Sequence, residues 1–254
     1  MYNEGSILIL GKISVFFVRH SQLKLEIIMR LGTTTTLARG VTAAASVSTT
    51  ERLVFIKKVY SLLALSMLTA AVGAYLGSGP LLLVVAPNMM LFFILEFALI
   101  IFASFVSRKP GLNMLALFSF TTLSGLTLGP LLYQVGPSIA AEAFALTAIT
   151  FASLTLYVVF SKKDFSFMSG FLMTGLIVVI AGGILNIFIG SPIMHFVMSG
   201  ASVLLFSGFI LYDTSNILRY YGTDEHVSAT LALYLDVLNL FIALLSILGI
   251  MSDD

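Results

Sequence analysis

Apolar runs alternate with short polar breaks along most of this chain, from Lys58 to its C-terminal end. A helix that crosses the hydrocarbon core of a bilayer needs about 20 mostly apolar residues, and seven runs are long enough. The breaks contain glycine, proline, serine or charged residues, which favour chain reversal. The predicted spans are residues 58–77, 86–106, 113–133, 138–160, 167–189, 194–218 and 229–250.

The first 50 residues do not follow this pattern. An apolar run at 6–18 is interrupted by Lys12 and is too short to span a membrane. It is interpreted either as a signal-like or interfacial segment, or as an upstream extension of a chain that starts at Met29. We favour the second interpretation. Residues 1–50 are therefore predicted to form a disordered cytoplasmic tail, with 1–28 as a mis-assigned start, and residues 51–254 a seven-helix transmembrane domain.

Composition supports a polytopic membrane protein whose main partner is the lipid bilayer. Of the 254 residues, 59% are hydrophobic and only 10% are charged, whereas a soluble domain has about 25% charged residues. The net charge of +1 gives no reason to expect a nucleic-acid partner. The absence of cysteine excludes disulfides, thiolate chemistry and cysteine-based metal sites.

The basic residues predict how the chain is oriented. All 13 Lys and Arg residues precede the first span or lie in the loops after the second, fourth and sixth spans. Cytoplasmic loops carry the excess of Lys and Arg in membrane proteins. The N-terminus is therefore predicted in the cytoplasm, and seven spans place the C-terminus outside. With no tryptophan, the interfacial aromatic positions fall to tyrosines near the span ends.

Two carboxylates in the last two spans are the main candidate site. Asp213 lies in the sixth span and Asp236 in the seventh, each followed three residues later by an asparagine, Asn216 and Asn239. An ionisable residue inside a span is costly to bury, so a functional site is the default hypothesis. The structural alternative is that the aspartates only tie two helices together.

The depth of the two aspartates suggests that they act as a pair. Asp213 lies six residues before Arg219, roughly 9 Å along a helix, and Asp236 lies eight residues after Ser228, roughly 12 Å. Two close carboxylates in a poorly hydrated site cannot both ionise cheaply, so the pair is expected to titrate as a unit. When both are deprotonated, they offer oxygen ligands for a hard cation such as Ca²⁺, and the asparagines can donate to them or lend carbonyl oxygens.

Glu96 is a third carboxylate inside a predicted span. We predict that it lies in the outer half of the second span. One hypothesis is an outer station for a cation on its way to the aspartates. The alternative is a single buried polar contact with a neighbouring Ser, Thr or Tyr.

Several motifs occur in an order and in spans that resemble one known family. They are Gly125-Leu-Thr-Leu-Gly-Pro130, Asp164-Phe-Ser-Phe-Met-Ser-Gly170, Gly182-Gly-Ile-Leu-Asn-Ile-Phe188, Gly208-Phe-Ile-Leu-Tyr-Asp-Thr-Ser-Asn-Ile217 and Leu233-Tyr-Leu-Asp-Val-Leu-Asn-Leu-Phe241. Over roughly residues 50–252 the chain resembles the Bax inhibitor-1, or transmembrane BAX inhibitor motif, family, and within it the bacterial YccA-like branch.

The resemblance implies a fold, a location and two functions. The fold is an all-α integral membrane protein of seven transmembrane helices, with the last helix central and surrounded by the other six. The location is the inner membrane. One function is a pH-sensitive Ca²⁺ leak governed by an aspartate pair, here Asp213 and Asp236, and the other is restraint of an FtsH-type membrane protease. Some members latch one aspartate with an arginine in the second span, but this chain has no arginine there before Arg108.

Enzymatic alternatives fit the sequence less well. An intramembrane aspartyl protease also has aspartates in its sixth and seventh spans, and Tyr212-Asp213 resembles its first motif. Its second motif requires Gly-x-Gly-Asp, whereas this chain has Tyr234-Leu-Asp236. The three histidines are too scattered for a zinc hydrolase. We therefore expect no enzymatic activity and no resident cofactor, and the Ca²⁺ leak and the protease partner both remain open. The sequence does not specify an oligomeric state.

Overall fold

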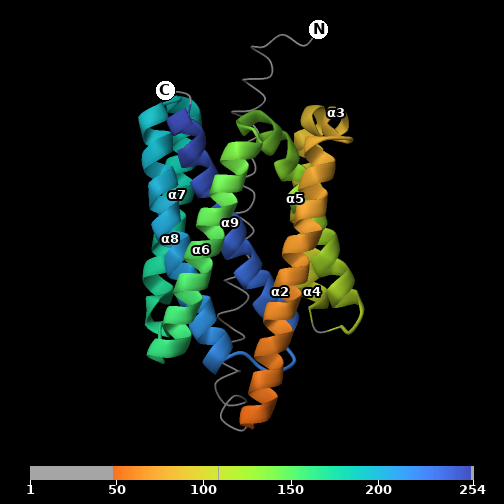
Figure 1. The fold of residues 1–254 in the computed structure, drawn as a ribbon, viewed down its shortest axis with the longest axis vertical. Helices are drawn as coiled ribbons and strands as arrows, with labels where there is room; N and C mark the ends of the chain where they lie inside the picture. Colours follow the sequence, from red (N-terminus) through yellow and green to blue (C-terminus); the bar gives the residue numbers. More distant parts are fainter. Residues whose placement is uncertain (1–47, 108, 253–254) are drawn as a thin grey trace.

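The computed structural model describes residues 48–107 and 109–252, which form helices and short connections (Figure 1). Seven of the helical segments are long and apolar enough to cross a membrane, which confirms the predicted number of spans. Five are single helices: α2 (Thr49–Ser78), α5 (Leu112–Val135), α6 (Pro137–Ser161), α8 (Pro192–Arg219) and α9 (His226–Ser252). The other two are composite: α3 (Leu82–Val85), η1 (Ala86–Asn88) and α4 (Met89–Val106) in the second span, and η2 (Ser166–Met168) and α7 (Ser169–Ile189) in the fifth.

The first helix starts nine residues before the predicted span. α2 begins at Thr49 because Ser48 caps it: the Ser48 hydroxyl accepts from the Glu51 N–H at 3.2 Å, and the Glu51 carboxylate accepts from the Ser48 N–H at 3.1 Å. This reciprocal capping box satisfies N–H groups that the first turn leaves unpaired. The predicted tail of residues 1–50 lies outside the described residues except for its last three, and the predictions for the 6–18 run and for a start at Met29 also fall there.

Pro87 divides the second span. Proline has no backbone N–H and fixes its φ angle, so a continuous α-helix through this position is unfavourable. The chain instead passes from α3 through the 3₁₀ turn η1 into α4. α4 is therefore shorter than the predicted span 86–106, and it begins at Met89.

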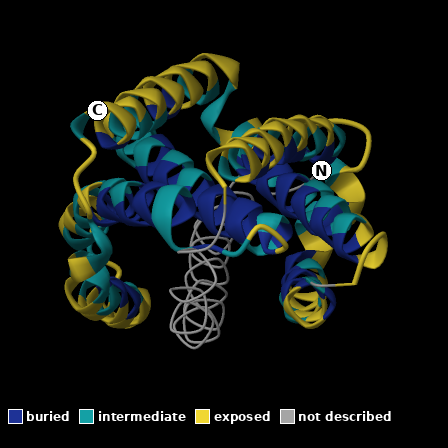
Figure 2. Ribbon diagram, turned by 90° about the horizontal axis from the view of Figure 1, so that it is seen from below, coloured by how far each residue is buried: buried dark blue, intermediate teal, exposed yellow. Residues whose placement is uncertain are grey.

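The last helix is the central one, as the family resemblance implied. In α9, 67% of the most apolar window is buried, against 17% in α6 and 22% in the fifth span. α9 packs mainly against α2, α5, α6 and α8, while α4 packs on α5 and α7 on α8. Four of the other six spans are thus its principal neighbours, and two lie behind them. Figure 2 shows the buried residues gathered on the inner helices and the exposed residues on the outward faces, where lipid would lie.

Four glycines bring the backbones of α2 and α5 into contact. Gly73 and Gly77 of α2 face α5, and Gly125 and Gly129 of α5 face α2. A Cβ atom at any of these positions would lie 1.9–2.2 Å from a backbone atom of the facing helix. Small residues four positions apart let membrane helices approach in this way. The two Gly-x-x-x-Gly pairs therefore define the closest helix contact of the described fold.

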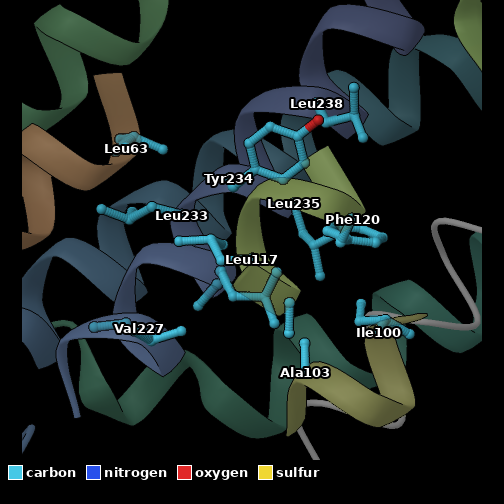
Figure 3. Packing of buried hydrophobic residues seen from close by; sticks show 14 of the residues in the cluster. Leu63, Ile100, Ala103, Leu117, Phe120, Val227, Leu233, Tyr234, Leu235 and Leu238 are labelled. Carbon is cyan, nitrogen blue, oxygen red and sulfur yellow. The ribbon is translucent and has the colours of Figure 1, made fainter. Parts of the chain in front are cut away.

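Two apolar clusters make up the core, and α9 contributes to both. The larger cluster is drawn mainly from α2, α4, α5 and α9 and also contains Ala143 of α6 and Ile217 of α8. The smaller joins α7, α8 and Leu240 of α9. Figure 3 shows the larger cluster around Tyr234, whose ring meets that of Phe120 edge to face with 5.8 Å between the centroids. Residues of α8 also belong to both clusters, so α8 and α9 together connect them.

The connections after α4, α6 and α8 and the start of α2 lie at one end of the bundle (Figure 1). We call this the basic end, because every Lys and Arg among the described residues belongs to it. The positive-inside rule predicts that this end faces the cytoplasm.

Candidate functional site

Both candidate aspartates are buried in the bundle. Asp213 is 1% exposed on α8, within the fully buried run 212–217. Asp236 is 0% exposed on α9, within the buried run 229–236. These two helices are joined by a short loop and pack closely against each other. The structure therefore places two carboxyl groups inside an apolar bundle on neighbouring helices.

The observed helix ends change the depth of one aspartate. Asp213 lies six residues before the end of α8 at Arg219, about 9 Å by helix rise. Asp236 lies ten residues after the start of α9 at His226, about 15 Å, because α9 begins three residues earlier than the predicted span. Both aspartates still lie in the half of the bundle nearer the basic end.

The two predicted supporting asparagines differ from each other. Asn216 is 1% exposed, and neither atom of its side-chain amide has a hydrogen bond to the part of the chain that the structure describes. Asn239 donates its side-chain N–H to the Leu235 carbonyl of its own helix at 2.8 Å. An unsatisfied buried amide is uncommon and calls for an explanation. Asn216, one turn from Asp213, is thus the amide that retains both its donor and its acceptor for a ligand.

Glu96 is also buried. It is 0% exposed on α4, seven residues after Met89 and ten before Val106. The second distance is about 15 Å from the basic end, the same depth as Asp236. Glu96 lies close enough to the Tyr234 hydroxyl to interact with it electrostatically. The structure therefore places Glu96 beside α9 in the half of its span nearer the basic end, and not in the outer half that the sequence analysis predicted. Its role as a cation station remains a prediction.

A polar network that the sequence analysis did not single out joins three helices next to Glu96. The Tyr234 hydroxyl of α9 hydrogen-bonds the Ser124 hydroxyl of α5, and Ser124 in turn donates to the Thr121 carbonyl at 2.9 Å. The Thr121 hydroxyl pairs with that of Thr69 on α2 at 2.6 Å. Isolated Ser and Thr residues in a span carry no sequence signal of such a network, because their own helix carbonyls usually satisfy them.

At the basic end, α2 holds the loop that joins the two aspartate-bearing helices. The Arg52 guanidinium donates to the Tyr221 carbonyl at 2.5 Å and to the Arg219 carbonyl at 3.1 Å. The last carbonyls of a helix lack partners within the helix, and a cation there also complements the helix dipole. Arg52 thus caps the end of α8 from a position 167 residues earlier in the chain.

The connection between α6 and α7 holds the same end of α8 from another side. The Asp164 carboxylate accepts from the Tyr220 hydroxyl, from the Ser215 hydroxyl at 3.3 Å and from the Ser166 N–H at 2.9 Å. Burial alone would raise the pKa of Asp164, but the hydrogen bonds from Tyr220 and Ser166 and the charge of Arg219 outweigh burial and lower the pKa. This contact explains why the 164–170 motif accompanies the motif on α8.

The described residues contain no group of three or more His, Cys, Asp or Glu side chains arranged to hold a metal ion. A Ca²⁺ ion at Asp213 and Asp236 would therefore need further oxygen ligands from amides, carbonyls or water, since Ca²⁺ takes six to eight.

Comparison with known proteins gives a family and several relatives. The family model described as "Inhibitor of apoptosis-promoting Bax1" matches residues 52–253. A protein of Vibrio cholerae described as an uncharacterized membrane protein is 42% identical over 211 residues, which are 78% of this chain and 90% of that protein.

Two further relatives have descriptive names. The Escherichia coli protein named "Modulator of FtsH protease YccA" is 34% identical over 203 residues, 78% of this chain and 91% of that protein. A vaccinia virus protein named "Golgi anti-apoptotic protein" is 34% identical over 213 residues, 82% of this chain and 90% of that protein. The names describe a modulator and an anti-apoptotic protein, and neither refers to a catalytic reaction.

Proposed function

Because the chain belongs to the Bax inhibitor-1 family of membrane proteins, we propose that it is a pH-sensitive Ca²⁺ leak of the inner membrane, gated by Asp213 and Asp236. The burial of these two carboxyl groups on packed neighbouring helices is the observation that carries the proposal. The unsatisfied amide of Asn216, one turn from Asp213, adds a polar group that a cation or a proton-bearing carboxyl group would engage.

The proposed gate follows from the cost of burying two like charges. A buried carboxylate loses its hydration, and a second one nearby adds repulsion. We propose that the pair shares a proton in the closed bundle. Loss of that proton as the pH rises leaves two charges that repel each other and attract a cation. We expect α8 and α9 to separate in that state, and a fall in pH to restore the closed packing.

The contribution of other titratable groups near α9 to the pH response must be distinguished from that of Asp213 and Asp236. Glu96 of α4 and Tyr234 of α9 lie together in the same half of the bundle. At the start of α9, His226 is near Lys58 and Asp224. The pH response of the native protein alone therefore cannot be assigned to the aspartates, and variants are needed.

The test is Ca²⁺ release from liposomes that contain the purified protein, measured across a pH series. We expect Asp213→Asn and Asp236→Asn to abolish the pH response, because an amide does not titrate. The matched control is Glu96→Gln, a carboxyl-to-amide change at the same depth. It should keep the pH midpoint, and a lower flux with that midpoint would support the cation-station hypothesis for Glu96. The absence of flux above that of protein-free liposomes would refute the leak.

A second function is supported by a specific comparison. The Escherichia coli relative carries a name that describes it as a modulator of FtsH protease. We propose that this chain also binds an FtsH-type membrane protease, with residues upstream of α2 as the contact. Co-purification with the protease should weaken when residues 29–47 are deleted and should not change with the aspartate variants. Ending the deletion at residue 47 preserves the Ser48–Glu51 cap of α2. Equal recovery with and without the segment would contradict this contact.

A further inference from the structure

Three hydroxyl groups from three helices meet inside the bundle, next to Asp213 in the sequence of α8. Tyr60 of α2 has its hydroxyl close to those of Thr155 of α6 and Thr214 of α8, but it is not in hydrogen-bonding geometry with either. All three oxygens are buried, and none has a hydrogen-bond partner among the described residues. We call Tyr60, Thr155 and Thr214 the hydroxyl cluster.

The two threonines of the cluster are exceptional in this bundle. A threonine inside a helix usually donates its hydroxyl to the carbonyl one turn earlier. Several threonines here do so at 2.7–2.8 Å: Thr127, Thr147, Thr174 and Thr230. Thr155 and Thr214 do not, although the same kind of carbonyl is available in their own helices. Their hydroxyls are therefore left available for another partner.

Leaving these groups unsatisfied would be costly. A buried hydroxyl without a partner costs about 1–3 kcal/mol, and such groups are rare in native proteins. A buried water molecule typically makes about three hydrogen bonds, and the cluster offers three hydroxyl groups. A water molecule can also bridge neighbouring hydroxyl groups that do not bond to each other directly. The chemistry of the cluster therefore matches water as its ligand.

The two threonines of the cluster lie at about the depth of Asp213 and nearer the basic end than Asp236. Thr214 is five residues before the end of α8, about 7.5 Å, and directly follows Asp213. Thr155 is six residues before the end of α6, about 9 Å. Asp236 lies about 15 Å from the start of its helix, so it is deeper than both threonines.

We propose that Tyr60, Thr155 and Thr214 bind water and form the polar route by which protons and cations reach the aspartate pair from the basic end. The transport part of this inference rests on the proposed leak, whereas the binding of water does not. The cluster offers only neutral oxygens, so it passes a cation or a proton without holding it, and the aspartates supply the charges that retain one.

The first test uses the absence of cysteine from the chain. Single cysteines replace Thr155 and Thr214, and the rate of modification by a small, positively charged methanethiosulfonate is measured in liposomes with reagent on both sides. The matched controls are Val158→Cys and Ile217→Cys. Each is 0% exposed and lies on the same helix, three residues nearer the basic end. A thiol reacts as its thiolate, which forms only where water reaches it.

We expect the two cluster positions to react at least about tenfold faster than their controls, although the controls are nearer to solvent along the helix. Equal rates within each pair would overturn the proposal. A second measurement does not require cysteines: Tyr60→Phe and Thr155→Val should each lower the Ca²⁺ leak at least about threefold and keep its pH midpoint. Thr147→Val is the control, because the Thr147 hydroxyl is satisfied by the Ala143 carbonyl. An unchanged leak in both cluster variants would contradict the route.

The two proposals fail in different ways. If the native protein releases no Ca²⁺, the leak is refuted, and the labelling rates still decide whether the cluster is hydrated. If the native protein does leak and the cluster cysteines react no faster than their controls, the route alone is wrong.

Discussion

The backbone contact between α2 and α5 makes Gly125→Ala the most informative packing variant. A Cβ atom at position 125 would lie 1.9 Å from the Ala70 carbonyl oxygen, and its next neighbours are also backbone atoms of α2, at 2.7 and 2.8 Å. Side-chain rotation cannot relieve a clash with backbone, so the helices must move apart. The shortest contact has to widen by at least 1.1 Å, from 1.9 to about 3.0 Å, the shortest distance that real Cβ contacts show.

This displacement sets the expected cost. A gap of 0.5–1 Å already forfeits a quarter to a half of the dispersion attraction at each contact, and α2 and α5 share the most extensive helix contact in the described fold. Overpacking a well-packed core typically costs about 1–3 kcal/mol, and we expect the upper end. At roughly 2–4 °C per kcal/mol, a loss of about 3 kcal/mol lowers the unfolding temperature by roughly 6–12 °C.

The assay is thermal unfolding of the purified protein in detergent, with Gly200→Ala as the matched control. Gly200 lies inside α8, and a Cβ atom there meets nothing within 4 Å. Alanine is favoured over glycine in a helix by up to about 1 kcal/mol, so this variant should be neutral or slightly stabilised. Equal unfolding temperatures for the two variants would refute the argument that backbone contact, rather than glycine itself, holds α2 against α5.

Three further predictions concern polar contacts, and thermal unfolding also measures them. Arg52→Ala loses two charged hydrogen bonds to the α8–α9 loop and should destabilise by about 1–3 kcal/mol; Arg52→Lys should recover only part, because an ammonium group lacks the planar fork. The lowered pKa of Asp164 means that its contribution is present above the ordinary aspartate pKa, near 3.9, and is lost as the pH falls through its own lower value. Asp164→Asn should therefore flatten the acid side of the stability profile, and an unchanged profile would contradict this. Tyr234→Phe removes one hydrogen bond and leaves Ser124 bonded to its own helix, so a loss of about 1 kcal/mol is expected, and a loss above about 3 kcal/mol would contradict a local effect.

The number of spans and their approximate ends follow from apolar length, because the bilayer fixes how long an apolar helix must be. The sequence is less informative where a helix continues beyond the membrane. The charged residues around Lys57 set the predicted start of the first span at residue 58, although the helix already begins at Thr49. A second local signal was present in the Ser48-x-x-Glu51 capping box, which marks a helix start whatever the hydropathy of the turns that follow.

The aspartates could be singled out from the sequence because a charge in an apolar run is locally conspicuous. The contacts that position them could not. Arg52 and the loop that it holds are 167 residues apart or more, and no local pattern pairs them. The hydroxyl cluster is harder still to predict. Thr155 and Thr214 differ from threonines such as Thr147 only in that their hydroxyls do not bond to a carbonyl of their own helix, and the sequence does not show this. Gly73 and Gly77 are an intermediate case. Their Gly-x-x-x-Gly spacing is recognisable in the sequence, but the sequence does not identify α5 as the helix that they contact.

The central position of α9 has a consequence for how the protein is made. A chain emerges from its N-terminus, so six spans enter the membrane before the helix that lies at the centre of the finished bundle. α2 and α5 can meet early through their glycines, and α7 and α8 share a small core of their own. The final span, α9, contributes to both apolar clusters. The most buried span is therefore the last to be made, and a chain stopped before residue 226 lacks its central helix rather than an outer one.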